Sequence, residues 1–482
     1  MKKQYSEIIV FARPWDLNCF LEIANKLCDD YNIKSVKVIS AWRAVIKDKQ
    51  RIENKNVSVH DIIELTKRSN PVLKKESTME INLFEDYLKS KGLTLNTLFS
   101  SERFLPKSSN EKIQFYYSNF EVLNALISED TILLSNQPDH YVYWLASELA
   151  LFKGGIFFGF SLVGRPSMWT QVLKDGNTSF DTYSYTPEHL KIAKSEIQNI
   201  IRGATIGYMM KDKPSFNLMN PILSRINYIR EKAHGNYFLD YFNFLGRFHL
   251  IYENLKYNWI LNKVDHKCLE DLKGKNIVYL ALHMQPEAST SVYSPFYKDQ
   301  LFWIESVIKS LPQKYTLVIK ENPKMHGKHP KSFYLKLQKY PNLVWISPET
   351  DSIELVKKSV LVLSITGTVA IEALAFGKKV VLFGRPPFAS FFRELWCVSN
   401  VNGLVRILGE ALSRNEPSLE DFEKDFANYI SNLVPDSFLK RKDSSGDMRI
   451  AFKESFYQYI RDSVEYELHK CNFTGKDNNY SY

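Results

Sequence analysis

Short apolar runs rich in Val, Ile, Leu and Phe recur along the chain, and segments with helical periodicity separate them. Such runs are typical of parallel strands buried on both faces of a sheet, and the segments between them are typical of crossover helices. The pattern occurs once in each half of the 482 residues, a length that suits two domains. It predicts an α/β protein with two doubly wound domains that face a cleft, a helical insert and C-terminal helices.

The expected elements divide the chain into four parts. Residues 1–169 form an N-terminal domain with strands Glu7–Arg13, Ser35–Ser40, Thr131–Asn136 and Gly155–Ser161 and helices Leu17–Tyr31 and Tyr141–Phe152. Residues 170–264 form a helical insert or linker, with helices Pro187–Arg202 and Tyr237–Trp259 and no convincing strand run. Residues 265–415 form a second domain with strands Asn276–His283, Tyr315–Lys320, Leu343–Ile346, Ser359–Ser364 and Lys379–Phe383 and helices Phe302–Leu311, Ser332–Lys339, Ser352–Lys358, Val369–Phe376 and Leu404–Ser413. Residues 416–482 form helices Leu419–Leu433 and Ile450–Lys470, which pack back toward the first domain, and a polar tail.

The charge balance favours anionic partners. Lys and Arg number 63 against 54 Asp and Glu, a net charge of +9, which suits nucleotide phosphates or acidic headgroups but equally a solvated Lys-rich surface. The charge is dispersed and no nucleic-acid motif occurs, so no nucleic-acid partner is expected. Peripheral membrane association through Phe388–Trp396 is one interpretation of its aromatic residues, and core packing is the other.

The compartment predicted from the sequence is the cytoplasm, either in solution or at the inner face of the cell membrane. The first residues, MKKQYSEIIVFARPWD, are typical of a first strand and not of a secretion signal. Five scattered cysteines without a C-x-x-C pair indicate reduced thiols. The most apolar passages, Tyr141–Gly164 and Val360–Gly384, are interrupted by charged residues and do not resemble membrane spans.

The stretch SITGTVAIEALAFGKKVVLFG, which begins at Ser364, places a polar turn between a buried strand and an apolar helix. Ser364, Thr366, Gly367 and Thr368 offer hydroxyls, unpaired backbone N–H groups and a helix N-terminus to an anion, and Gly367 allows a ligand to approach the backbone. The alternative is an ordinary helix cap. Glu372, in the following helix, either accepts sugar or ribose hydroxyls or lies exposed on the outer face.

Two further polar loops follow strands of the second domain. Because ligands of such sheets bind beyond the carboxyl ends of the strands, these loops predict one site together with the turn at Ser364. No metal site is expected from His326 and His329, and the residues indicate no cofactor. The candidate residues of the two loops are His283, Gln285 and Glu287, and Lys320, Glu321 and Asn322.

Two aspartates at strand ends of the first domain are candidates for a general base. Asp16 follows the first strand and Asp139 follows Thr131–Asn136, positions at which a carboxylate could serve as a base toward a bound ligand. Each also directly precedes a helix, so a helix cap is the alternative. Arg13 and Arg165 are either phosphate-facing or surface charges.

Several motifs in order resemble the bacterial capsule polysaccharide biosynthesis family. They are PEAST at Pro286–Thr290, VIKENP at Val318–Pro323, PETDS at Pro348–Ser352 and ITGTVAIEALAFGKKV at Ile365–Val380. The family includes the Kdo transferases of capsule assembly and is more distantly similar to GT-B glycosyltransferases and nucleotide-sugar 2-epimerases. The resemblance covers roughly Val278 to Gly384.

The resemblance implies two Rossmann-like domains of the GT-B type and a nucleotide-sugar donor, linked to CMP, UDP or GDP, in the second domain. It places Thr366–Thr368 near the donor phosphates and Glu372 near the ribose or base. The family's Lys-Glu-His-Pro motif, whose histidine contacts phosphate, reads Lys-Glu-Asn-Pro here, and Asn322 cannot carry the charge of that histidine.

The implied function is a metal-independent glycosyltransferase that moves a sugar to a capsule glycan or a lipid-linked glycan. The alternatives are a nucleotide-sugar 2-epimerase of the same fold and a non-catalytic component of a capsule-assembly complex.

Overall fold

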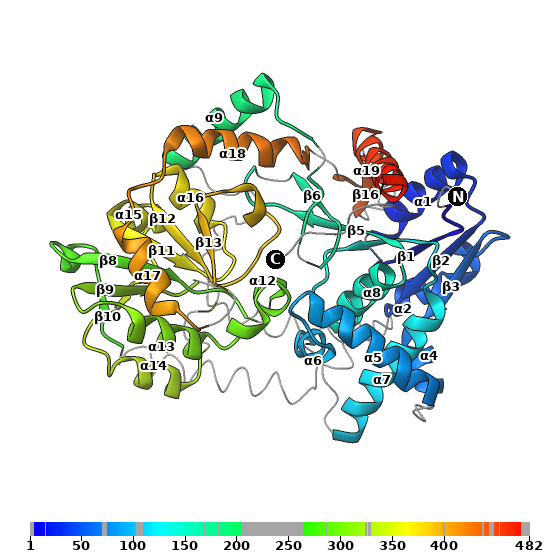
Figure 1. Cartoon of the computed structure of the whole chain (residues 1–482), viewed down its shortest axis with the longest axis horizontal. Coiled ribbons are helices and arrows are strands. Elements are labelled where there is room, and N and C mark those ends of the chain that lie inside the picture. Colours follow the sequence, from blue (N-terminus) through cyan, green and yellow to red (C-terminus); the bar gives the residue numbers. More distant parts are fainter. Residues whose placement is uncertain are drawn as a thin grey trace.

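Two seven-stranded sheets organise the chain, one in each half (Figure 1). The structure is a computed structural model. It describes residues 4–14, 16–69, 75–102, 109–166, 169–176, 178–181, 183–203, 264–285, 287–322, 325, 329–398, 401–435, 438–442, 448–452 and 454–473. The predicted helix Tyr237–Trp259 lies outside these residues.

The first sheet has the strand order β14-β6-β5-β4-β1-β2-β3. Its strands from β5 to β3 pair in parallel, and β6 and β14 pair antiparallel at one edge. The strands are β1 (Glu7–Phe11), β2 (Ser35–Ser40), β3 (Val57–Asp61), β4 (Thr131–Asn136), β5 (Ile156–Leu162), β6 (Thr170–Leu173) and β14 (Leu433–Val434).

Helices cover both faces of this sheet, as parallel strands require. In α1 the buried residues recur at helical spacing, from Leu17 through Phe20, Ile23 and Leu27. The helices are α1 (Leu17–Tyr31), α2 (Arg43–Lys47), α3 (Lys49–Ile52), α4 (Ile62–Arg68), α5 (Lys75–Ser90), α6 (Leu95–Ser100), α7 (Ser109–Leu126) and α8 (Tyr141–Phe152).

The second sheet has the strand order β13-β12-β11-β8-β9-β10-β7, and every pairing is parallel. Its strands are β7 (His266–Lys267), β8 (Asn276–Ala281), β9 (Tyr315–Lys320), β10 (Leu343–Ile346), β11 (Ser359–Ser364), β12 (Lys379–Leu382) and β13 (Leu395–Cys397). Its helices are α12 (Ala288–Ser291), α13 (Gln300–Ser310), α14 (Lys331–Leu337), α15 (Ser352–Lys358), α16 (Val369–Ala375) and α17 (Leu404–Ser413). The predicted α/β class with two doubly wound sheets is confirmed.

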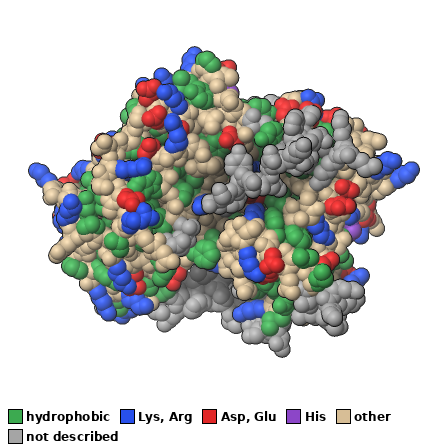
Figure 2. Space-filling model, viewed as in Figure 1, with side chains coloured by type: hydrophobic (Ala, Val, Ile, Leu, Met, Phe, Trp, Pro, Cys, Tyr) green, Lys and Arg blue, Asp and Glu red, His purple; other side chains and the backbone are tan. Residues whose placement is uncertain are grey.

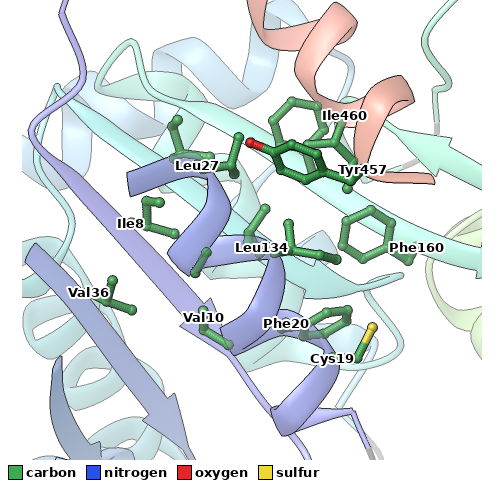
Figure 3. Close-up of a cluster of buried hydrophobic side chains, with 14 of the residues drawn as sticks. Ile8, Val10, Cys19, Phe20, Leu27, Val36, Leu134, Phe160, Tyr457 and Ile460 are labelled. Atoms are coloured by element: carbon green, nitrogen blue, oxygen red, sulfur yellow. The ribbon is translucent and has the colours of Figure 1, made fainter. Parts of the chain in front are cut away.

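Two described segments, before α9 (Pro187–Ile201) and after α18 (Leu419–Ser431), pass from one half to the other. Helix α9, which begins at a Thr186 capping box, runs beside α18, and both pack on the core of the second half (Figure 1). After α18 the chain returns, because β14 joins the first sheet and α19 (Glu454–Phe473) covers it. Figure 3 shows Tyr457 and Ile460 of α19 beside Leu27 and Phe160 of the first half.

Some predicted boundaries were wrong. Residues 170–173, assigned to a strandless insert, form β6 and extend the first sheet. The predicted helix Ile450–Lys470 begins later, at Glu454, because Met448–Phe452 forms β16, which pairs with β15 (Phe438–Lys442) in a hairpin. The short strands β3, β7 and β13 were also not predicted. The division at residues 169, 264 and 415 stays a prediction.

The surface carries mixed charge. On the face drawn in Figure 2, Lys and Arg side chains lie among Asp and Glu and do not gather into one patch. Among the described residues, no helix combines the length and the apolarity of a membrane span. Phe388, Phe391 and Phe392 are buried, and Phe392 packs on Phe422 and Phe426 of α18, so core packing is the correct interpretation of these three aromatic residues.

Candidate functional site

A polar cluster lies where β1 and β4 end in the first sheet. Arg13 and Asp16 follow β1, whereas Asn136 is the last residue of β4 and precedes Asp139. Neighbouring parallel strands bring their carboxyl ends to the same edge, which is why residues 120 positions apart, Asp16 and Asn136, are in hydrogen-bond contact. Both predicted base candidates therefore lie in one cluster.

Asp16 is the buried member of this cluster, with 2% of its surface exposed. Its Oδ1 accepts a hydrogen bond from the Arg13 backbone N–H at 2.7 Å, and its Oδ2 accepts one from the Asn136 side-chain amide. Burial raises the pKa of Asp16 to about 7, although these donors and Arg13 oppose the shift. Asp16 stands at the N-cap of α1, but its side chain makes no cap hydrogen bond, so the cap interpretation is wrong.

Asp16 should make the stability of the protein depend on pH. Its folded-state pKa of about 7 lies above the ordinary 3.8, so between these values the folded protein keeps a proton that the unfolded chain loses. The contribution of Asp16 is therefore present at pH 4 and is lost as the pH rises to 7. Asp16→Asn removes this loss. The free energy of unfolding of the variant, relative to that of the wild type, should therefore increase by up to about 4 kcal/mol between pH 4 and pH 8.

Urea unfolding at pH 4.5, 6 and 8 measures this difference. Asp86→Asn, at an exposed position on α5, is the matched control and should show a pH-independent difference from the wild type. If the free energies of unfolding of Asp16→Asn and the wild type differ by the same amount at all three pH values, Asp16 does not have the raised pKa assigned to it.

Asp139 is the accessible member of the cluster. Its Oδ1 lies 2.7 Å from Nη2 of Arg13 and 3.0 Å from Nδ1 of His140, and 25% of its side chain is exposed. The N-cap of α8 is His140 and not Asp139. The carboxylate therefore pairs with a cation from the neighbouring strand end, and the predicted cap at Asp139 is wrong.

His283 organises the polar turn of the second half. Its Nε2 accepts backbone N–H groups from Ile365 at 3.2 Å and Thr366 at 3.3 Å, and it lies 3.0 Å from Ser364 Oγ. Since backbone amides only donate, the ring is neutral with its proton on Nδ1. Burial lowers the pKa of His283 to about 4, which keeps the ring neutral at physiological pH.

The turn differs from its prediction in one respect. Its N–H groups were expected to be unpaired, but His283 accepts two of them and Ser364 Oγ accepts the N–H of Gly367 at 3.0 Å. A Cβ at Gly367 would lie 2.7 Å from Ser364 Oγ, so packing within the protein already requires glycine there. His283, which accepts the first two N–H groups, lies about 80 residues upstream in the sequence. A pattern within the turn could therefore not predict that these groups are paired.

The two threonines of the turn differ in their contacts. The Thr366 hydroxyl donates to the Ser289 carbonyl at 3.0 Å and so ties the turn to α12. Thr368 occupies the N-cap of α16, but its side chain makes no cap hydrogen bond, so the simple cap interpretation is wrong for this residue.

Glu372 lies in a charged cluster that the two halves share. Arg165, which follows β5 of the first sheet, places its Nη2 3.1 Å from Glu372 Oε1. Burial raises the pKa of Glu372, although Arg165 opposes the shift. Lys320, at the end of β9, donates to Ser352 Oγ at 2.6 Å and also acts on the charge of Glu372. The expected outer-face alternative for Glu372 is wrong, since only 13% of its side chain is exposed.

The other predicted donor-site residues serve local contacts. Gln285 donates to the Lys298 carbonyl, and Glu287 accepts the Ser289 hydroxyl at 2.8 Å. Glu321 accepts the Tyr334 hydroxyl at 2.7 Å and lies 3.7 Å from His329. The Asn322 carbonyl accepts the Met325 N–H at 2.8 Å. The structure thus brings together His283, Ser364, Thr366 and Gly367, and beside them Lys320 and Glu372.

Tyr293 joins the second half to the first and was not predicted. It follows α12 in the second half, and its hydroxyl donates to Gln137 Oε1 of the first half at 3.1 Å. Burial and then the charge of Asp139 raise the pKa of Tyr293, which places the two side chains close enough to interact. Ser352 was likewise missed, although the PETDS motif contains it. Among the described residues no group of three or more His, Cys, Asp or Glu side chains is suited to hold a metal.

Comparisons with known proteins support the resemblance. Residues 232–391 match the family model described as capsule polysaccharide biosynthesis protein, which confirms the predicted resemblance over that part of the chain. No curated protein matches the chain.

Solved structures match only weakly. The beta Kdo 2,7 transferase of KpsC from Thermosulfurimonas dismutans is 13% identical over 74% of this chain and 91% of its own, with a TM-score of 0.30. The UDP-GlcNAc 2-epimerase from Neisseria meningitidis is 12% identical over 96% and 99%, with a TM-score of 0.26. A glycosyltransferase from Rickettsia africae is 10% identical over 98% and 100%, with a TM-score of 0.28. At these TM-scores the likeness does not indicate an activity.

Proposed function

We propose that the chain is a glycosyltransferase that moves a sugar from a CMP-, UDP- or GDP-linked donor to a capsule glycan or another surface glycan or glycolipid. One observation carries the proposal: each sheet ends in a polar cluster, and contacts of Tyr293 with Gln137 and of Arg165 with Glu372 join the two halves. The match of residues 232–391 to the capsule polysaccharide family supports it. The enzyme would act in the cytoplasm, where such donors are made, or at the inner face of the membrane.

The second half is proposed to hold the donor. His283 and Ser364 fix the turn at Thr366–Thr368, so the turn is preorganised beside Lys320 and Glu372. Lys320 supplies positive charge for the departing phosphate, since preorganised charges stabilise a charge that develops in a transition state. Glu372 accepts hydroxyl groups of the ribose or the sugar. In this arrangement the protein supplies the charge neutralisation, so a metal is not required.

The first half is proposed to hold the acceptor. Asp139 acts as the base that takes the proton of the attacking hydroxyl, because it is the more exposed of the two aspartates and Arg13 holds it in place. Asp16 holds the ends of β1 and β4 together, since its two oxygens accept hydrogen bonds from the Arg13 N–H and the Asn136 side chain.

Nucleotide binding tests the donor site. A ligand that binds only the folded protein stabilises it, by about 2.7 kcal/mol at a ligand concentration about one hundred times Kd. The melting temperature of the protein must then rise. We expect one of CMP, UDP or GDP, or a sugar conjugate, to give this shift and Glu372→Ala to lose most of it. Glu410→Ala, on the exposed side of α17, is the matched control and should keep the full shift.

Product analysis tests the reaction class. Incubation of the protein with the bound nucleotide sugar alone should leave that sugar unchanged, and transfer should require a glycan acceptor. Epimerised nucleotide sugar formed without an acceptor would overturn the transferase proposal in favour of a 2-epimerase. Binding without turnover on any capsule fragment, together with intact surface glycan in a Glu372→Ala strain, would favour a non-catalytic assembly component.

A further inference from the structure

Arg165 connects the first sheet to two helices of the second half. It lies just beyond β5 and is 4% exposed. Its Nη2 is 3.1 Å from Glu372 Oε1 on α16, and its Nη1 is 3.3 Å from Glu196 Oε1 on α9. Both helices pack in the core of the second half. The guanidinium therefore crosses from one half to the other at the proposed donor site.

Glu372 has several charged or titratable neighbours besides Arg165. Lys320 comes from the end of β9, Asp351 from the residue before α15 and Tyr279 from β8. Burial and Asp351 favour the protonated carboxyl, whereas Arg165 and then Lys320 favour the carboxylate. Arg165 also makes the direct hydrogen bond, so it opposes the effect of burial more strongly than Lys320 does.

The charge of Glu372 decides what it can bind. A carboxylate only accepts hydrogen bonds and can take both hydroxyls of a vicinal diol, whereas a protonated carboxyl must also donate one. Arg165 contacts Oε1, and a carboxylate retains acceptor capacity on its second oxygen when one oxygen is engaged. An ionised Glu372 thus suits a ribose or sugar diol.

We propose that Arg165 is a positioning residue of the donor site, which holds the Glu372 carboxylate oriented from the opposite half so that it accepts the donor's hydroxyl groups. This proposal rests on the proposed function, since it assumes a nucleotide-sugar donor. It adds that donor recognition depends on docking of the two halves, because the residue that prepares Glu372 belongs to the first sheet. Glu196 shares the guanidinium and holds it from the other side.

The first experiment measures the binding of CMP, UDP and GDP by calorimetry at pH 6.5 and pH 8.5. The wild type should change its Kd less than about twofold, because Arg165 opposes the rise in the pKa of Glu372 that burial causes. In Arg165→Met the pKa of Glu372 rises, so binding should be about tenfold weaker at pH 6.5 than at pH 8.5. Arg165→Lys should restore most of the pH independence. Glu410→Gln, at an exposed position on α17, is the matched control and should bind as the wild type at both values.

A double variant separates charge from structure. Arg165→Met with Glu372→Gln should bind weakly but without pH dependence, because the titrating group is gone. If Arg165→Met weakens binding equally at both pH values, or leaves it unchanged, the positioning role is overturned. If Arg165→Met does not fold, Arg165→Lys is measured in its place, and its binding must then be independent of pH.

A second readout needs no ligand. In Arg165→Met the folded protein keeps a proton on Glu372 that the unfolded chain loses, so its melting temperature should fall relative to the wild type by about 2–4 °C from pH 5 to pH 8. The Glu372→Gln background should abolish this fall. If no nucleotide binds the wild type but the fall is seen, the proposed donor fails while the charge coupling of Arg165 stands. If the fall is absent, the coupling itself is wrong.

Discussion

Replacement of Asp139 by asparagine is expected to lower the rate of sugar transfer by about 10²–10⁴-fold, the usual contribution of a positioned general base. Asparagine keeps the shape of the side chain but cannot take a proton. The pairing with Arg13 at 2.7 Å holds the carboxylate at the end of β4, and the contact of Tyr293 with Gln137 brings the second half close to it. Donor binding should be unchanged, since the proposed donor residues lie on the other sheet.

The measurement is steady-state transfer from the identified nucleotide sugar to a glycan acceptor, with the nucleotide thermal shift as the check on folding. Asp16→Asn is the matched control: Asp16 is 2% exposed and both its oxygens are engaged, so this variant should lose less than about tenfold in rate. If Asp16→Asn is the inactive variant and Asp139→Asn keeps more than a tenth of the activity, the roles of the two residues are reversed.

The strands that the sequence predicts well are those buried on both faces. Tyr315–Lys320 and Ser359–Ser364 were predicted with the observed ends, because a parallel strand in the middle of a sheet reads as a continuous apolar run between polar loops. Val57–Asp61 was missed because it alternates polar and apolar residues at the sheet edge. The strand Thr170–Leu173 was missed because its four buried residues include a threonine and a glutamine.

The candidate site follows the same division. The rule that ligands bind beyond strand ends grouped His283, Lys320 and Ser364 correctly, because all three stand at the ends of strands in one parallel sheet. Contacts between the halves could not be predicted in this way. Arg165 meets Glu372 across 207 positions of sequence, and that contact depends on how the two sheets dock.

The turn that follows Ser364 is expected to depend most strongly on the His283 ring. His283→Leu keeps most of the volume but removes Nε2, which leaves the N–H groups of Ile365 and Thr366 buried without their acceptor. An unsatisfied buried donor costs about 1–3 kcal/mol, so the free energy of unfolding should fall by about 2–5 kcal/mol. The nucleotide thermal shift should also disappear, because the turn at Ser364 loses the group that organises it.

His283→Gln separates the hydrogen bonds from the packing, because its side-chain oxygen can approach the position of Nε2. This variant should recover at least half of the lost stability and a measurable nucleotide shift. His329→Leu is the matched control, since that buried ring stacks on Phe333 away from the turn and its loss should leave the nucleotide shift in place. Equal loss of the shift in His283→Leu and His329→Leu would mean that the effect is general destabilisation and not loss of the turn.

The pH dependence gives an independent check on the same ring. Because its pKa in the folded protein is about 4 against the ordinary 6.5, the unfolded chain binds a proton there that the folded protein does not. Stability is therefore full above pH 6.5 and is lost as the pH falls toward 4, by about 3 kcal/mol. His283→Gln has no such group, so in urea unfolding its stability should approach that of the wild type as the pH drops from 7 to 4. A difference that stays constant over this range would show that the ring does not titrate as its burial requires. The assignment of His283 as a neutral acceptor for the turn that follows Ser364 would then be wrong.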